Sequence, residues 1–124
     1  MRYLGLDLGR KRTGIAFADS TDDILFSLMT IEGKTEEELV ECISALVSEK
    51  MIDELVVGLP LLPSGKAGSQ AQWVESVIIH LKTLGIPVSV LDERYTTGKR
   101  TDIDQDAAAA CQILSVKLSR NTHL

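Results

Sequence analysis

The chain has 124 residues, with thirteen Lys and Arg against eighteen Asp and Glu, which gives a formal charge of −5 at pH 7. Apolar residues make up 44% and charged residues 25%, a composition that excludes disordered, collagen-like and membrane-embedded proteins. The length suits one core, and neither a secretory leader nor a membrane-spanning run occurs. We therefore expect residues 1–124 to form a single cytoplasmic domain.

The acidic excess lies between residues 34 and 54, where seven acidic residues accompany two basic ones. We interpret this segment as one solvated helix face. The rest of the chain is balanced, so basic residues elsewhere can form local positive patches that bind nucleic acid. Cys42 and Cys111 fall among apolar helical positions, and we expect both to be reduced core residues.

The first third of the chain is typical of a β-meander. Residues 3–8 form a predicted strand, residues 9–13 a tight basic turn, residues 14–18 the return strand and residues 24–31 a third strand. Helical periodicity then begins after Thr35.

Glu38 stands where a capping box with Thr35 requires it, and the apolar spacing that follows predicts a helix over residues 36–50. Residues 54–58 form a short apolar run bounded by Gly58 and Pro60, which is typical of a buried parallel strand.

A glycine-rich loop to Gly68 precedes a second predicted helix, which carries Val74 to Leu81 and is closed by Gly85. Residues 88–91 form a further buried strand, and residues 106–118 form the last helix. This order predicts an α/β fold in which helices flank a mixed five-stranded sheet, with a meander on one side and βαβ crossovers on the other.

Asp7 interrupts the apolar stretch of the first strand, which we expect at the centre of the sheet. An unpaired carboxylate is costly in a strand interior unless a cation or hydrogen-bond donors compensate it. Asp7 could instead cap the turn at residues 9–13 through backbone N–H groups. The interior position favours a functional role.

Asp92 and Glu93 come directly after a buried strand, at the edge where α/β sheets form ligand sites. A strand-ending turn with a salt bridge to Arg94 is an equally good explanation of this pair alone. Strand alternation lets only one of the two face Asp7, and we favour Glu93 because its longer side chain reaches over the sheet edge. Asp106 begins the last helix, where a carboxylate stabilised by the helix dipole is the simpler explanation.

Taken together, carboxylates from a first strand, a later strand end and a last helix suit hard divalent cations such as Mg²⁺ or Mn²⁺. Two such ions activate an attacking water and stabilise the leaving oxygen of a phosphodiester. The predicted catalytic residues are Asp7, Glu93, Asp106 and Asp92, of which Asp7, Glu93 and Asp106 bind the metal.

Four segments resemble the YqgF family in this order: residues 4–16 (LGLDLGRKRTGIA), 56–60 (VVGLP), 92–97 (DERYTT) and 106–114 (DAAAACQIL). The resemblance implies an RNase H-like fold and an endonuclease that resolves Holliday junctions or matures the 5′ end of 16S ribosomal RNA. It also implies that the metal-binding acids are Asp7, the Asp92–Glu93 pair and Asp106. The family usually has a further helix before the last acid, which is shortened here to a polar segment.

Basic and polar residues near these acids are candidate contacts for phosphates that flank the scissile bond. Aromatic residues make up only 4% of the chain, which favours recognition through backbone and shape. Tyr95 and Trp73 are the aromatic candidates, and Trp73 is more typical of a core residue. The candidate substrate contacts are Lys11, Arg12, Lys66, Arg94, Thr96 and Thr97, with Lys99 and Arg100 nearby.

The leading hypothesis is a metal-dependent endonuclease acting on structured RNA, with ribosomal precursor favoured. A four-way DNA junction resolvase is the main alternative, and a dimer would support it because symmetrical cleavage needs two sites. A nucleic-acid-binding module with weakened catalysis is a third hypothesis. An actin-like ATPase also has an Asp-x-Gly before a hairpin, as at Asp7 and Gly9, but needs a second domain.

Overall fold

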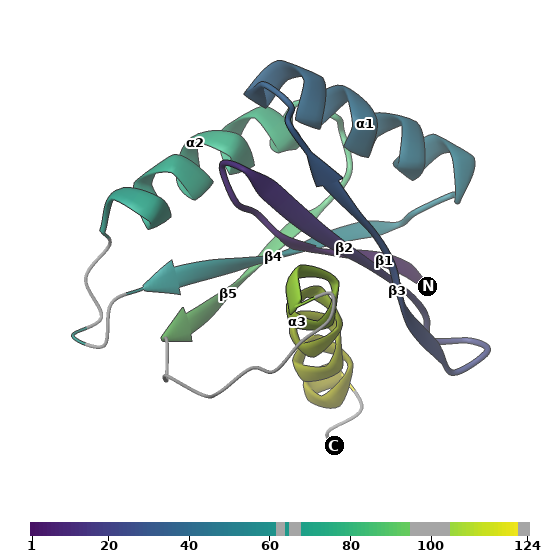
Figure 1. Ribbon diagram of the computed structural model, residues 1–124. Helices are drawn as coiled ribbons and strands as arrows, with labels where there is room; N and C mark the ends of the chain where they lie inside the picture. The colour runs from purple at the N-terminus through teal and green to yellow at the C-terminus, as the bar shows by residue number, and fades with distance from the viewer. Residues whose placement is uncertain (62–63, 65–67, 95–104, 122–124) are drawn as a thin grey trace.

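Five strands form one mixed sheet in the computed structural model (Figure 1). The structure describes residues 1–61, 64, 68–94 and 105–121, and the side chains at 61, 92–94, 105–108, 120 and 121 lie outside that description. The strands are β1 (Arg2–Asp7), β2 (Arg12–Asp19), β3 (Ile24–Glu32), β4 (Glu54–Leu61) and β5 (Val88–Arg94).

The strand order is β3-β2-β1-β4-β5, so β1 lies at the centre of the sheet. β1, β2 and β3 pair antiparallel as a meander, whereas β4 pairs parallel with both β1 and β5. The predicted α/β fold, with three antiparallel strands and two parallel ones, is confirmed.

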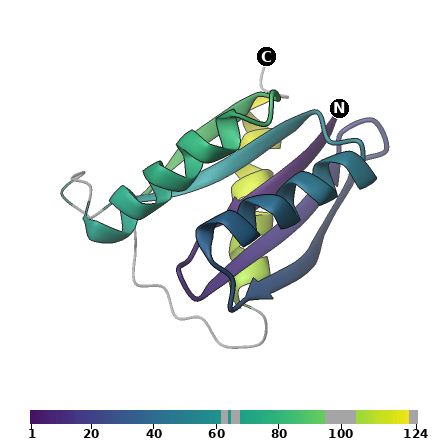
Figure 2. The same ribbon diagram turned by 90° about the horizontal axis from the view of Figure 1, so that it is seen from above.

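Three helices cover the two faces of this sheet. α1 (Glu36–Glu49) and α2 (Ser69–Lys82) pack on one face, and α3 (Gln105–Asn121) crosses the other (Figure 2). The predicted capping box of α1 is present, because Glu38 N donates to Thr35 Oγ1 at 3.1 Å and Thr35 N donates to Glu38 Oε1 at 2.9 Å. The second of these hydrogen bonds lowers the pKa of the Glu38 carboxyl. Within the described residues, no helix is long and apolar enough to cross a bilayer.

Side-chain alternation divides the apolar residues into two cores. Leu4 and Leu6 of β1 belong to the core beneath α1 and α2, whereas Tyr3 belongs to the core beneath α3. Ala110, Ile113 and Leu114 supply the buried stripe of α3. Each strand residue is thereby assigned to one of two faces, and this assignment locates the candidate site.

A partly buried polar cluster fixes the direction of α3 along the sheet. Lys117 Nζ lies 3.1 Å from Glu54 Oε2 and 3.3 Å from Ser89 Oγ, and Ser89 also donates to Glu54. Glu54 and Ser89 stand at the beginnings of β4 and β5, so the C-terminal half of α3 lies there and its first turn lies at the opposite edge. The expectation that the acidic segment is wholly solvated is wrong for Glu54, because its pairing with Lys117 allows burial to 9% exposure.

Gly5 lets α3 pack directly against the backbone of β1. A Cβ atom at this position would lie 2.5 Å from Leu114 Cγ and 2.9 Å from the Ala110 carbonyl oxygen. No side chain other than hydrogen fits in this space, so the spacing between helix and sheet depends on this glycine.

β4 and β5 are longer than expected. β4 continues through Pro60 to Leu61, and β5 continues to Arg94 instead of ending at residue 91. Pro60 is tolerated because β4 extends beyond β1: the β1 pairing ends at Val57, and only β5 accompanies β4 from there onward. Asp92 and Glu93 therefore lie within β5, and the expectation that they follow the end of the strand is wrong.

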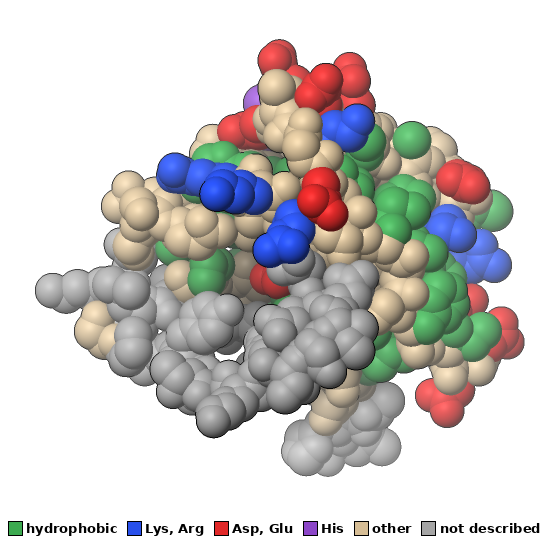
Figure 3. All heavy atoms as spheres, viewed as in Figure 1, with side chains coloured by type: hydrophobic (Ala, Val, Ile, Leu, Met, Phe, Trp, Pro, Cys, Tyr) green, Lys and Arg blue, Asp and Glu red, His purple; other side chains and the backbone are tan. Residues whose placement is uncertain are grey.

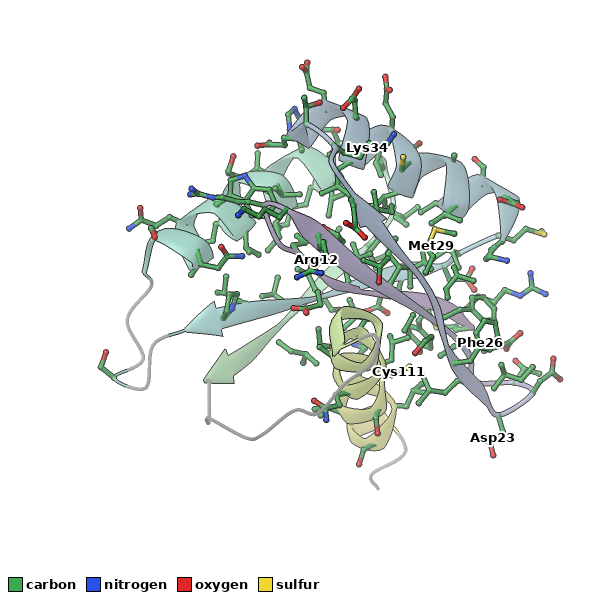
Figure 4. The ribbon with its side chains drawn as sticks, in the orientation of Figure 1. Arg12, Asp23, Phe26, Met29, Lys34 and Cys111 are labelled. Carbon is green, nitrogen blue, oxygen red and sulfur yellow. The ribbon has the colours of Figure 1, made fainter. Side chains whose placement is uncertain are left out.

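The two cysteines are half-buried, which corrects their assignment to the core. Cys111 Sγ lies 3.4 Å from Ser27 Oγ, where α3 borders the edge strand β3 (Figure 4). Both thiols are free. Their helical spacing places them beside the buried stripe and not at its centre.

We predict that Gly5→Ala destabilises the fold by about 1–3 kcal/mol, because the added methyl group overpacks the contact with α3. Urea unfolding of the variant measures this cost. The double variant Gly5→Ala/Leu114→Ala should lose less than the sum of the two single losses, since truncation of Leu114 removes one colliding atom. Simple additivity would contradict the role assigned to this contact.

Candidate active site

The parallel strands β1, β4 and β5 end at one edge of the sheet, and α3 begins at the same edge (Figure 1). Asp7 is the last residue of β1 and is half-buried, so its expected place in a strand interior is corrected to the strand end. Alternation from Tyr3 through Gly5 puts Asp7 on the face that α3 covers.

The register of the parallel strands relates Asp7 to the acidic pair of β5. Leu6 pairs with Val57, Gly58 pairs with Leu91, and Pro60 pairs with Glu93. Leu91 belongs to the core beneath α3, so position 93 falls on the α3 face and position 92 on the opposite face.

Gly58 contributes no side chain between Asp7 and Leu91, which pairs with Gly58 on β5. It follows Val56, a residue of the α3 core, by two positions and therefore lies on the same face. β4 thus places no side chain between β1 and β5 at the level of Asp7, whereas position 93 pairs with Pro60, which lies on the same face two residues further along β4.

Position 106 lies in the first turn of α3, one turn before Ala110. Residues four apart share a helix face, and Ala110 is the residue whose carbonyl approaches Gly5. Position 106 therefore falls on the sheet-facing side of α3, at the edge where β1 ends. The side chains of Asp92, Glu93 and Asp106 lie outside the described residues, and the described residues alone contain no cluster of three metal-binding side chains.

Thr13 closes the turn between β1 and β2, a role that the sequence interpretation missed. Its hydroxyl accepts from Gly9 N at 3.4 Å and donates to the Gly9 carbonyl at 3.3 Å, and the residue is 1% exposed. A Cβ atom on Gly9 would lie 2.4 Å from the Arg12 carbonyl oxygen, so this turn requires glycine. The available signal was a threonine four residues after a glycine at the foot of a hairpin.

Three consecutive exposed cations, Arg10, Lys11 and Arg12, occupy this turn, and Lys and Arg side chains gather over it in Figure 3. Arg12 shares the α3 face with Asp7, because alternation in β2 leads from Arg12 to the buried Ala16 (Figure 4). The other predicted substrate contacts fall outside the described side chains, namely Lys66, Arg94, Thr96 and Thr97, as do Tyr95, Lys99 and Arg100.

Trp73 is half-buried against the core beneath α1 and α2, so the expectation of a core residue is right in part. The guanidinium carbon of Arg10 lies 6.0 Å from the centroid of its ring. Arg10 was not among the predicted substrate contacts, because nothing in the sequence links residue 10 to residue 73.

A family model described as "RuvX: Holliday junction resolvase" matches residues 1–120. The chain belongs to this family. A curated relative from Trichormus variabilis, named "Putative pre-16S rRNA nuclease", is 41% identical over 95 residues, which cover 76% of this chain and 63% of the relative. A relative of the same name from Anaeromyxobacter sp. is 39% identical over 98 residues, covering 78% of this chain and 72% of the relative.

The chain therefore spans less than two thirds of the length of the Trichormus relative. Among solved structures, Thermus thermophilus RuvC in complex with a Holliday junction substrate matches with a TM-score of 0.65 and 11% identity. The match covers 98% of this chain and 97% of RuvC. The shared fold confirms the RNase H-like class expected from the sequence motifs.

We predict that Thr13→Val lowers the free energy of unfolding by about 1–3 kcal/mol, because two backbone groups of Gly9 lose their buried partner. Thr13→Ser keeps the hydroxyl and serves as the matched control. Urea unfolding of both variants tests the assignment. A loss confined to Thr13→Ser, with wild-type stability in Thr13→Val, would show that the methyl group, and not the hydroxyl, stabilises the turn.

Proposed function

We propose that this chain is a metal-dependent endonuclease that hydrolyses phosphodiester bonds, with the 16S ribosomal RNA precursor as its favoured substrate. The proposal is supported by strand register and helix periodicity, which assign three acidic positions to one edge of the sheet. Asp7 ends β1 on the α3 face, position 93 of β5 shares that face, and position 106 lies in the first turn of α3. The names of the curated relatives favour the RNA substrate.

Asp7, Glu93 and Asp106 would hold one or two Mg²⁺ or Mn²⁺ ions, because carboxylate oxygens are the donors that these hard cations prefer. When bound, such ions activate water and stabilise the leaving oxygen. The chain supplies rigid positions for the three carboxylates, two on strands and one on a helix that is packed on the sheet. Lys11 in the turn after β1 and Arg12 at the beginning of β2 would bind phosphates beside the scissile bond.

A four-way DNA junction is the second candidate substrate. It is favoured by the description of the family and by the fold shared with a resolvase along nearly its whole length. Symmetrical junction cleavage needs two active sites and therefore two copies of this chain. Cleavage of RNA needs only one copy.

The test is cleavage of labelled 16S precursor RNA and of a four-way DNA junction, each with Mg²⁺, Mn²⁺ or a chelator. Asp7→Asn should abolish metal-dependent cleavage and leave the fold intact or more stable, since it removes one of several crowded carboxylates. Melting with Mn²⁺ is a readout independent of turnover, because ions that bind only the native site raise the melting temperature of the wild type. Near-wild-type turnover of the variant at saturating Mg²⁺ would refute the nuclease assignment.

The two substrates separate the remaining hypotheses. Cleavage of the junction alone would transfer the assignment to a resolvase. Binding of RNA that needs magnesium, without cleavage of either substrate, would identify a binding module with weakened catalysis.

We predict different effects for the two acids of β5. Position 93 lies on the face of Asp7 and position 92 on the opposite face, so Glu93→Gln should remove activity with little change in stability. Asp92→Asn should mainly lower stability and keep measurable turnover. Cleavage rates and melting temperatures of both variants decide the matter, and the reverse pattern would assign the ligand to Asp92.

A further inference from the structure

The basic turn between β1 and β2 extends over both faces of the sheet edge. Arg12 lies on the α3 face with Asp7, whereas Arg10 reaches the other side and lies over Trp73 of α2. Within the described part of the chain, no carboxylate forms an ion pair with Arg10 or Lys11. Two adjacent cations of this turn are therefore available to an anionic partner.

The position of Trp73 relative to this turn is fixed by contacts from α2. Gln70, three residues before Trp73, donates from Nε2 to the Leu8 carbonyl oxygen at 3.1 Å. This hydrogen bond ties the first turn of α2 to the residue that follows β1. Trp73 itself packs against the buried core, so its ring is a firm support for the Arg10 side chain.

A guanidinium that lies over an indole ring keeps the N–H groups at its edges available for hydrogen bonds. These N–H groups match the oxygens of a phosphate and can bind two of them at once. Because the ring already restricts the Arg10 side chain, less conformational entropy is lost when it binds an anion. Arg10 is thus a better phosphate ligand than an unsupported surface arginine.

We propose that Arg10, held by Trp73, binds a backbone phosphate of the nucleic acid on the α2 side of the sheet edge. The bound strand then crosses the β1–β2 turn, from the scissile phosphate beside Asp7 on the α3 face to a flanking phosphate on the α2 face. The path past Asp7 rests on the proposed function, whereas the phosphate contact of Arg10 does not require cleavage.

The test is binding of the full chain, with chelator present, to a fluorescent RNA hairpin that carries a single-stranded 5′ extension. A four-way DNA junction is the second probe, and anisotropy is measured over a series of KCl concentrations. Arg10→Gln should reduce the slope of log K against log salt by about 0.7 to 0.9, the value of one phosphate contact. Lys82→Gln, which removes an exposed cation from the other end of α2, should leave the slope unchanged.

Trp73→Leu keeps every charge, so it should preserve the salt slope while weakening binding about two- to fivefold through the lost support of Arg10. In an Arg10→Gln background, Trp73→Leu should have no further effect on binding. In the chain that keeps Arg10, Trp73→Phe should bind more tightly than Trp73→Leu, because its ring again lies beneath the guanidinium. This coupling separates support of Arg10 from a general effect on folding.

An Arg10→Gln slope equal to that of Lys82→Gln would overturn the proposal, as would an undiminished Trp73→Leu effect in the Arg10→Gln background. A reduced slope with either probe supports the contact and shows which nucleic acid supplies the phosphate. If Arg10→Gln changes the slope but neither substrate is ever cleaved, the nuclease assignment fails and the phosphate contact stands.

Discussion

The close approach of α3 to β1 at Gly5 is the constraint on which the candidate site depends. A helix normally stands off a sheet by the length of the side chains between them, but here a strand residue without a side chain lies beneath a helix carbonyl. The short distance brings the first turn of α3 close to the plane of the sheet. An acidic residue in its first turn can then lie beside a carboxylate that ends the central strand.

Packing at one glycine does not by itself stop a helix from sliding along the strand. The cluster of Lys117, Glu54 and Ser89 supplies that second constraint at the far end of α3. A partly buried ion pair adds little net stability, because desolvation offsets much of its attraction. Its directional contacts instead define a register, and the register sets where the helix begins relative to the sheet edge.

Periodicity and motif order were sufficient to predict the element order and the mixed sheet. The ends of β4 and β5 could not be predicted, because Gly58 and Pro60 are residues that typically terminate a strand. Here β4 continues through both and pairs with β5, since its pairing with β1 has already ended. Glu54 looked like one more surface acid, since its partner Lys117 is remote in sequence.

At the site itself, strand alternation predicts that Asp7 and Glu93 share a face, and the register of β4 with β5 is consistent with this prediction. The turn chemistry of Thr13 and the pairing of Arg10 with Trp73 depend on tertiary contacts that no local pattern encodes.

Two sets of tertiary contacts hold α3 on the sheet, in addition to its covalent connection to β5. When a helix is positioned by contacts of its own, the length of the preceding connection affects mainly the entropy of closing a loop. Each doubling of a flexible loop costs only about 0.6 kcal/mol. Family members can therefore differ in the number of residues between the fifth strand and the last helix, and so in what they present to a substrate there, while the helix keeps its place on the sheet.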